Sequence, residues 1–219
     1  MWSSEVTNMI ITGIWETLYM TLVSTLAGYV IGLPMGIILT VSDKDGIKPN
    51  AVLYKILDVI ANIVRSVPFI ILLVLLIPFT RLVVGKSYGS TATIVPLVIA
   101  AAPYIARMVE SSLKEVDAGV IEAARSMGAS NFTIITKVML VEARTSLLVG
   151  ATITLGTILG YSAMSGAVGG GGLGAIAIRY GYTRWQTDIM IVTVILLIIL
   201  FQIFQTVGMK LADKFDHRK

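Results

Sequence analysis

The chain has 219 residues, of which 56% are hydrophobic and only 14% are charged, and its mean hydropathy is +0.86. A soluble domain of this length needs more charged surface, so the composition excludes a soluble globule, a disordered tail and a fibrous repeat. It indicates a membrane protein with several spans. Cysteine is absent, and the single histidine, His217, lies near the C-terminus. We therefore expect no disulfide, no metal or cofactor site and no thiol or histidine catalytic residue in this chain.

Five apolar runs are each long enough to cross a bilayer, which requires about 20 residues. In chain order they cover residues 18–41, 56–79, 91–109, 146–165 and 188–209. The sequence predicts an all-α protein in which residues 1–219 form one transmembrane domain with a long polar loop at 110–145. The first run has no basic segment before it and no clear cleavage site, so we expect it to be retained as a span.

Lysine and arginine are distributed unequally between the two sides of this arrangement. Twelve of these residues lie on one side, in loops 42–55 and 107–145 and in the C-terminal tail. Four lie on the other side, in the segments that follow the second and fourth runs. Positive residues accumulate on the cytoplasmic side of membrane proteins. We therefore expect a multi-pass protein of the cell membrane with its N-terminus outside and its C-terminus in the cytoplasm. The net charge of +4 forms no basic stripe, so no nucleic acid partner is expected.

Small residues recur at helical spacing in two of the runs. Gly28, Gly32 and Gly36 lie on one face of the first, and Gly156 and Gly160 repeat the spacing in the fourth. Such faces let helices approach closely within a bilayer. Two interpretations are open at this point, packing within the chain and packing between two copies of it.

The second run carries three polar residues on one helical face, Asp58, Asn62 and Arg65. Charge at membrane depth is costly, so these residues are expected to face protein or water. Either they line a pathway or contact the cytoplasmic loops, or they form a structural bridge from which Arg65 extends to the interface.

A glycine-rich segment, residues 166–174, follows the fourth run. Its glycines match GxGxxG, but they follow an apolar helix rather than a strand, so we exclude a dinucleotide site. The sequence also lacks a Walker A motif, so any ATP must be bound by another chain. We expect a tight turn here. Tyr161 and Met164 precede it, and Met164 either closes a narrow conduit or packs between helices.

The loop at 110–145 is expected to contain two short helices separated at Gly128. Asp117 is placed to cap the first and Ser130 to cap the second. Four apolar residues at helical spacing predict one apolar stripe on the first helix: Val116, Val120, Ala124 and Met127. A helix of this kind lies either on lipid or in the groove of a partner.

The loop carries a short motif, Glu122-Ala123-Ala124, with Gly128 four residues further on and an aliphatic pair ten residues after that glycine, Val138 and Leu140. These residues and intervals resemble the EAA loop of ABC-type importer permeases. Valine 141 stands where proline is usual. Four further segments resemble the methionine-uptake permeases of this group: residues 62–69, 77–81, 102–110 and 160–169.

The resemblance implies the fold of a type I ABC importer permease with five transmembrane helices and a cytoplasmic coupling helix. It implies a homodimer, two copies of an ATPase subunit that binds ATP and Mg²⁺, and an extracytoplasmic substrate-binding protein. The solute it implies is methionine, as one or both enantiomers.

Two groups of candidate site residues follow from the resemblance. The coupling loop is expected to contact the ATPase through four residues: Glu122, Ala123, Ala124 and Gly128. The translocation path between the two chains is expected to contact three: Arg65, Tyr161 and Met164. Three alternatives are open: the same permease type for another amino acid or a small peptide, a membrane-embedded enzyme, and an autonomous channel. Few carboxylates lie in the spans, which disfavours the enzyme.

Overall fold

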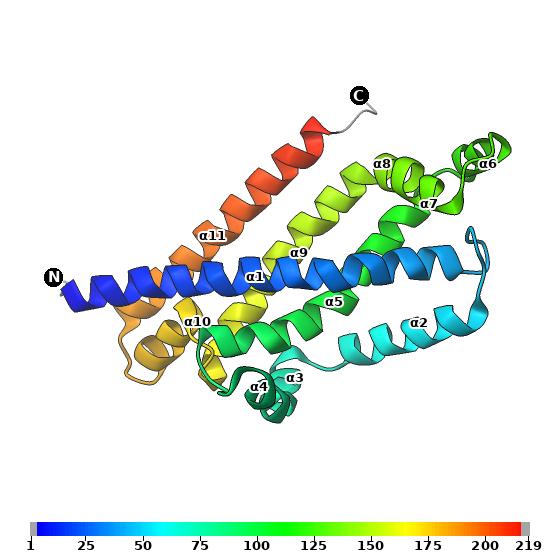
Figure 1. Cartoon of the computed structure of the whole chain (residues 1–219). Helices are drawn as coiled ribbons and strands as arrows, with labels where there is room; N and C mark the ends of the chain where they lie inside the picture. The colour runs from blue at the N-terminus through cyan, green and yellow to red at the C-terminus, as the bar shows by residue number, and fades with distance from the viewer. Residues whose placement is uncertain (1–3, 216–219) are drawn as a thin grey trace.

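The computed structural model describes residues 4–215, so His217 and the rest of the tail lie outside the described part. Four helical segments within it are long and apolar enough to cross a membrane, and Figure 1 shows them as the long members of one bundle. They are α1, Ser4–Ser42; α5, Ser90–Lys114; α9, Arg144–Ser165, with its continuation to Tyr182; and α11, Thr187–Lys214. At 1.5 Å per residue the 39-residue α1 is about 58 Å long, so it extends beyond the hydrocarbon layer or tilts strongly within it.

The second apolar run, residues 56–79, is not one continuous helix. It is divided among three helices: α2, Ala51–Ser66; α3, Phe69–Leu75; and α4, Ile77–Val84. The chain bends by 101° between α2 and α3. Pro68 at this bend lacks an N–H group and restricts Val67 to an extended conformation, with φ −81° and ψ 124°. Counted as one broken span, α2 and α3 bring the number of spans in the described part to five.

The glycine face of α1 packs against α5 within the chain. A Cβ atom on Gly32 would lie 2.5 Å from the carbonyl oxygen of Ala102, and one on Gly36 would lie 2.6 Å from that of Ala106. Because backbone atoms cannot rotate away as a side chain can, only glycine permits this approach. For the first run, packing within the chain is therefore confirmed.

The two glycines of α9 differ in their surroundings. A Cβ atom on Gly156 would lie 2.6 Å from the ring of Phe201 on α11, whereas nothing lies within 4 Å of one on Gly160. Gly156 therefore serves a contact within the chain, and Gly160 leaves an open position on the helix.

The glycine-rich segment forms the predicted compact turn at one end of the bundle. It forms η2, Gly166–Val168, and the start of α10, Gly172–Ile176. A further short helix follows directly, η3, Ala177–Tyr182. Two side chains of α1 accept hydrogen bonds from the start of α10. The Glu16 carboxylate accepts one from the N–H of Gly172 at 2.6 Å, and the Thr17 hydroxyl accepts one from that of Leu173 at 2.9 Å. These bonds join the turn to α1.

The opposite end of the bundle carries the α1–α2 turn and the loop helices (Figure 1). The loop begins at Glu115 rather than at residue 110, because α5 continues to Lys114. Its helices are α6, Ala118–Ser126; α7, Asn131–Thr133; η1, Ile134–Met139; and α8, Leu140–Glu142. Asp117 accepts a hydrogen bond from the N–H of Gly119 at 2.8 Å, and Ser130 accepts one from that of Thr133 at 3.2 Å. Both predicted caps are confirmed.

Candidate functional site

The two adjacent alanines of the loop motif lie on different faces of α6. Ala124 is 5% exposed and belongs to the same buried cluster as Ile134 and Met139. Ala123 and Glu122 are exposed. The inner alanine therefore holds α6 against its own chain, and the outer face is open to a partner.

The prediction that Val116, Val120, Ala124 and Met127 form one apolar face of α6 is wrong. Val116 is partly buried and packs with Ala124 on the core. It precedes Ala118, the first helical residue, so the helical period does not extend to it. Three apolar side chains of this region are instead exposed: Val120 at 41%, Met127 at 81% and Phe132 at 75%. The apolar residues of this region are thus divided between the core and the outer surface.

α6 ends in a Schellman motif at Gly128. Gly128 has φ 80°, and its N–H donates to the carbonyl oxygen of Arg125 at 3.0 Å. The N–H of Ala129 donates to the carbonyl oxygen of Ala124 at 3.1 Å, which completes the motif. Nothing lies within 4 Å of a Cβ built on Gly128, so the backbone conformation alone favours glycine here. The predicted break at Gly128 is confirmed.

α6 is also fastened to the α1–α2 turn. A guanidinium N–H of Arg125 donates to the carbonyl oxygen of Ile47 at 3.1 Å. A groove of about 490 Å³ lies between this turn, the end of α5 and α6, and charged side chains line part of it, including Asp43, Lys114 and Glu122. Arg125 thereby links the loop helix directly to the segment that joins α1 and α2.

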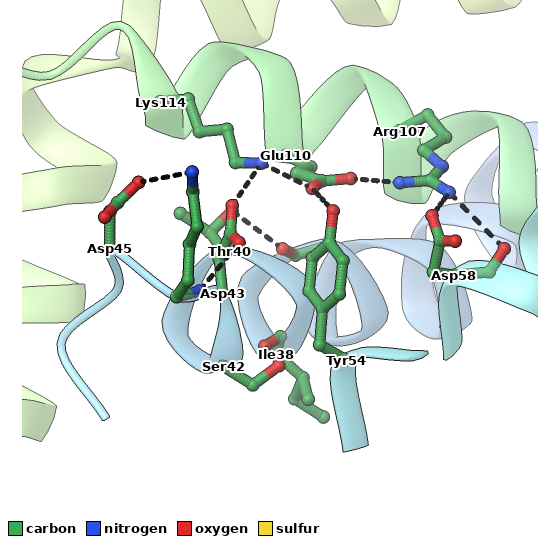
Figure 2. A network of polar contacts seen from close by, with 12 residues as sticks. Ile38, Thr40, Ser42, Asp43, Asp45, Tyr54, Asp58, Arg107, Glu110 and Lys114 are labelled. Atoms are coloured by element: carbon green, nitrogen blue, oxygen red, sulfur yellow. Dashed lines mark hydrogen bonds and ion pairs between the residues drawn. The ribbon is translucent and has the colours of Figure 1, made fainter. Parts of the chain in front are cut away.

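A network of ion pairs joins the same turn to α2 and α5, as Figure 2 shows. Arg107 of α5 pairs with Asp58 of α2 and, at 2.7 Å, with Glu110. Lys114 pairs with Glu110 at 2.8 Å and with Asp43 at 2.6 Å. The hydrogen bond from Lys114 lowers the pKa of the Asp43 carboxyl below its usual value, which favours the ionised form. Three elements of this end are therefore held together by charge.

The sequence argument missed this network. It placed Asp58 and Asn62 on a stripe of α2, but not their partner Arg107, whose guanidinium donates to the Asn62 amide oxygen at 3.0 Å. The available signal was the spacing of Arg107, Glu110 and Lys114, which puts three charges on one helical face. Across residues 4–215 no three His, Cys, Asp or Glu side chains are grouped so that they could hold a metal ion.

Arg65 and Tyr161 come together in a pocket at the break between α2 and α3. The pocket has a volume of about 180 Å³ and is lined from α2, α3, α5 and α9. The rings of Phe69 and Tyr161 stack with their centroids 4.4 Å apart, and Tyr104 of α5 also lines the pocket. Met164 is 52% exposed on α9 and does not line the pocket. The structure therefore brings together two of the three predicted path residues.

The architecture matches known membrane proteins along nearly its whole length. Residues 32–218 match the family described as "Binding-protein-dependent transport system inner membrane component". The chain is 48% identical to the probable D-methionine transport system permease protein MetI of Vibrio cholerae serotype O1, over 99% of this chain and 96% of that protein. It is 55% identical to the D-methionine transport system permease protein MetI of Escherichia coli strain K12, over 72% of this chain and 73% of that protein.

A solved structure shares the fold. It is described as an inward-facing conformation of the MetNI methionine ABC transporter, and one of its chains matches with a TM-score of 0.97 at 49% identity, over 99% of this chain and 100% of that chain. This similarity confirms the all-α permease fold that the EAA-type loop implied. With the family matched across residues 32–218, the chain belongs to the inner membrane components of binding-protein-dependent transport systems.

Proposed function

We propose that this chain is the permease subunit of an ATP-driven importer that carries methionine across the cell membrane. The observation that carries the proposal is the 49% identity, over 99% of this chain, to a chain of the MetNI methionine ABC transporter. The relatives named for D-methionine support the same solute over another amino acid or a small peptide. Residues 1–219 act as one transmembrane domain.

The importer contains two copies of this chain and two copies of a separate ATPase chain. ATP and Mg²⁺ bind to the ATPase, in agreement with the lack of a Walker A motif in this sequence. An extracytoplasmic binding protein delivers the solute. This division of labour gives the permease chain no catalytic residue of its own.

Coupling to the ATPase runs through α6. Its outer face, which includes Glu122 and Ala123, docks on the ATPase because it is the face that the chain leaves exposed. Ala124 holds the helix on its own chain, and Gly128 ends it. When the ATPase dimer closes on ATP, it moves α6. The Arg125 contact and the ion-pair network pass this movement to the turn after α1, to α2 and to α5.

The solute crosses the membrane between the two copies, past the α2–α3 break and α9. Arg65 and Tyr161 contact it in their shared pocket. Met164, exposed on α9, provides a flexible apolar side chain that fits the closure of a narrow path. ATP-driven movement of the helices exposes this path alternately to the two sides.

Uptake of labelled methionine tests the proposal. Cells that lack their own methionine uptake would express this chain with its ATPase and binding protein, and each component would be omitted in turn. We expect uptake that needs all of them and that unlabelled methionine suppresses. Uptake that needs the ATPase but follows another solute contradicts the methionine assignment, and transport by the chain alone contradicts the importer.

A further inference from the structure

Arg65 differs from the two basic residues of α5. Arg107 and Lys114 are each paired with two carboxylates. Within residues 4–215, by contrast, the guanidinium of Arg65 has no hydrogen-bond or ion-pair partner. A charge in a transmembrane segment is costly and is usually retained because it pairs with something or serves a function. Arg65 is exposed in the single chain and pairs with no carboxylate of the described residues, so its guanidinium is available to a bound anion.

The pocket beside Arg65 has the size and lining for one small solute. Its volume of about 180 Å³ lies below the range of roughly 300–1,000 Å³ found for drug-sized ligands. Its lining combines the guanidinium with the stacked rings of Phe69 and Tyr161 and with Tyr104. A pocket of this size fits a small solute better than an oligopeptide, and its mixture of one charge with aromatic rings suits a short solute that has a charged and an apolar end.

The α2–α3 break supplies an opposite charge next to Arg65. α2 ends at Ser66, and the N–H of Val67 donates to the carbonyl oxygen of Val64 at 3.4 Å. The carbonyl groups of this last turn form the negative end of the helix dipole. The chain then turns by 101° and does not cover this end with a continuing helix. Cations are stabilised at such a C-terminus. A guanidinium and a helix C-terminus lie side by side at this break and suit the two charges of a zwitterion.

We infer that this pocket is an intramembrane binding site for the transported amino acid, held as a zwitterion with a linear apolar side chain. The carboxylate pairs with Arg65, the ammonium faces the C-terminal end of α2, and the side chain contacts the rings of Phe69 and Tyr161. A thioether gains from this contact because sulfur interacts favourably with aromatic rings. The inference rests on the proposed function and adds that the permease itself recognises the solute.

Photo-crosslinking locates the site. The purified complex of this chain with its ATPase, in lipid nanodiscs without the binding protein, is irradiated with photo-methionine and its peptides are analysed by mass spectrometry. We expect labelling of residues 64–72, 100–104 or Tyr161 that excess methionine suppresses. The inference is overturned if the label that excess methionine suppresses is found only on the ATPase or elsewhere in this chain. It is also overturned if methionine suppresses none of the label.

Charge variants test the role of Arg65. We expect Arg65→Gln to weaken photo-methionine labelling about 10- to 100-fold, as loss of a charged hydrogen bond does, and Arg65→Lys to retain part of it. Arg81→Gln, which removes an exposed arginine of α4 outside the pocket, serves as the matched control and leaves labelling unchanged. Equal labelling of Arg65→Gln and the wild type overturns the carboxylate contact.

A solute analogue keeps the test decisive if Arg65→Gln folds poorly. Methioninol, in which an alcohol replaces the carboxylate, is expected to compete with photo-methionine at least about 10-fold less well than methionine on the wild-type complex. Equal competition by the two compounds contradicts the inference. If uptake is selective for methionine but the pocket is not labelled, only this inference is wrong and the proposed function stands. If the ATPase drives uptake of another solute instead, the proposed function is wrong.

Discussion

Glu110 is the residue on which the polar network at the α6 end depends. Its side chain is 6% exposed, and it accepts hydrogen bonds from Arg107, Lys114 and Tyr54, which lie on α5 and α2. A carboxylate with so little water is stable as an anion only when neighbouring groups compensate its charge. Removing that anion leaves two cations with one carboxylate each, and solvent screens Arg107 poorly because its side chain is only 17% exposed.

We expect Glu110→Gln to lower the free energy of unfolding by about 3 kcal/mol, the lower end of the range for breaking a buried pair. The measurement is the unfolding midpoint of the purified protein in detergent, together with its folded yield. Lys44→Ala is the matched control, because the side chains of the Lys44–Asp45 pair are 85% and 84% exposed. Its effect should stay within about 0.5 kcal/mol. Equal effects of the two variants would show that the network contributes no more than a surface pair.

At the scale of elements, the contact between α1 and α5 depends on glycine. We expect Gly32→Leu to destabilise the protein by about 3 kcal/mol or more, since even its Cβ would lie 2.5 Å from the backbone oxygen of Ala102.

Gly160→Ala on α9 is the matched control, because a Cβ at this position meets nothing within 4 Å. Alanine there should be neutral or stabilising by up to about 1 kcal/mol, because it favours the helix over glycine. Thermal unfolding of the two purified variants checks both results, and a mild effect of Gly32→Leu contradicts the packing argument.

The two alanines of α6 separate docking from folding. Ala123 is exposed, so Ala123→Arg should leave the folded yield unchanged, and we expect it to reduce ATP-driven uptake at least about 10-fold by blocking the outer face. Ala124 is 5% exposed, so Ala124→Arg should lower the folded yield by placing a charge in the core. Size-exclusion profiles and uptake assays measure the two effects. Normal uptake by Ala123→Arg rules out docking through this face.

Sequence reasoning succeeded at elements whose signals are local. Asp117 lies at the start of α6 and Gly128 at its end, and each makes its hydrogen bonds with residues only a few positions away. The residue types and their spacing therefore predict where the helix begins and ends. The bend at Pro68 was harder to predict, because hydropathy is continuous across it and proline alone does not fix the direction of the chain. A run of apolar residues gives the length of a segment but not its path.

The candidate site shows the same limit more strongly. Arg107 and Asp58 are 49 positions apart, and the helical period shows which residues share a face but not which two faces meet. Arg65 and Tyr161 could be nominated one by one, but their shared pocket depends on how α2 and α3 turn against α9. Met164 lies one helical turn from Tyr161 and still lines no part of that pocket, because it points to the exposed side.

At the scale of the whole molecule, the two ends of the bundle differ in their charge. The end with α6 and the α1–α2 turn carries most lysine and arginine residues, and the end with the glycine-rich turn carries few. This asymmetry orients membrane proteins with the richer side in the cytoplasm. The proposed coupling requires the same orientation, since an ATPase inside the cell would reach α6 only from that side.

The chain itself offers a direct test of this orientation, because it contains no cysteine. Asp45→Cys places a thiol in the α1–α2 turn and Lys86→Cys places one after α4, both at exposed positions. We expect a membrane-impermeant maleimide to label Lys86→Cys on spheroplasts, and Asp45→Cys only after the membrane is permeabilised. The unchanged chain is the control for background labelling. The reverse pattern would put α6 outside, where no ATP is available, and coupling through α6 would then be impossible whatever the pocket at Arg65 binds.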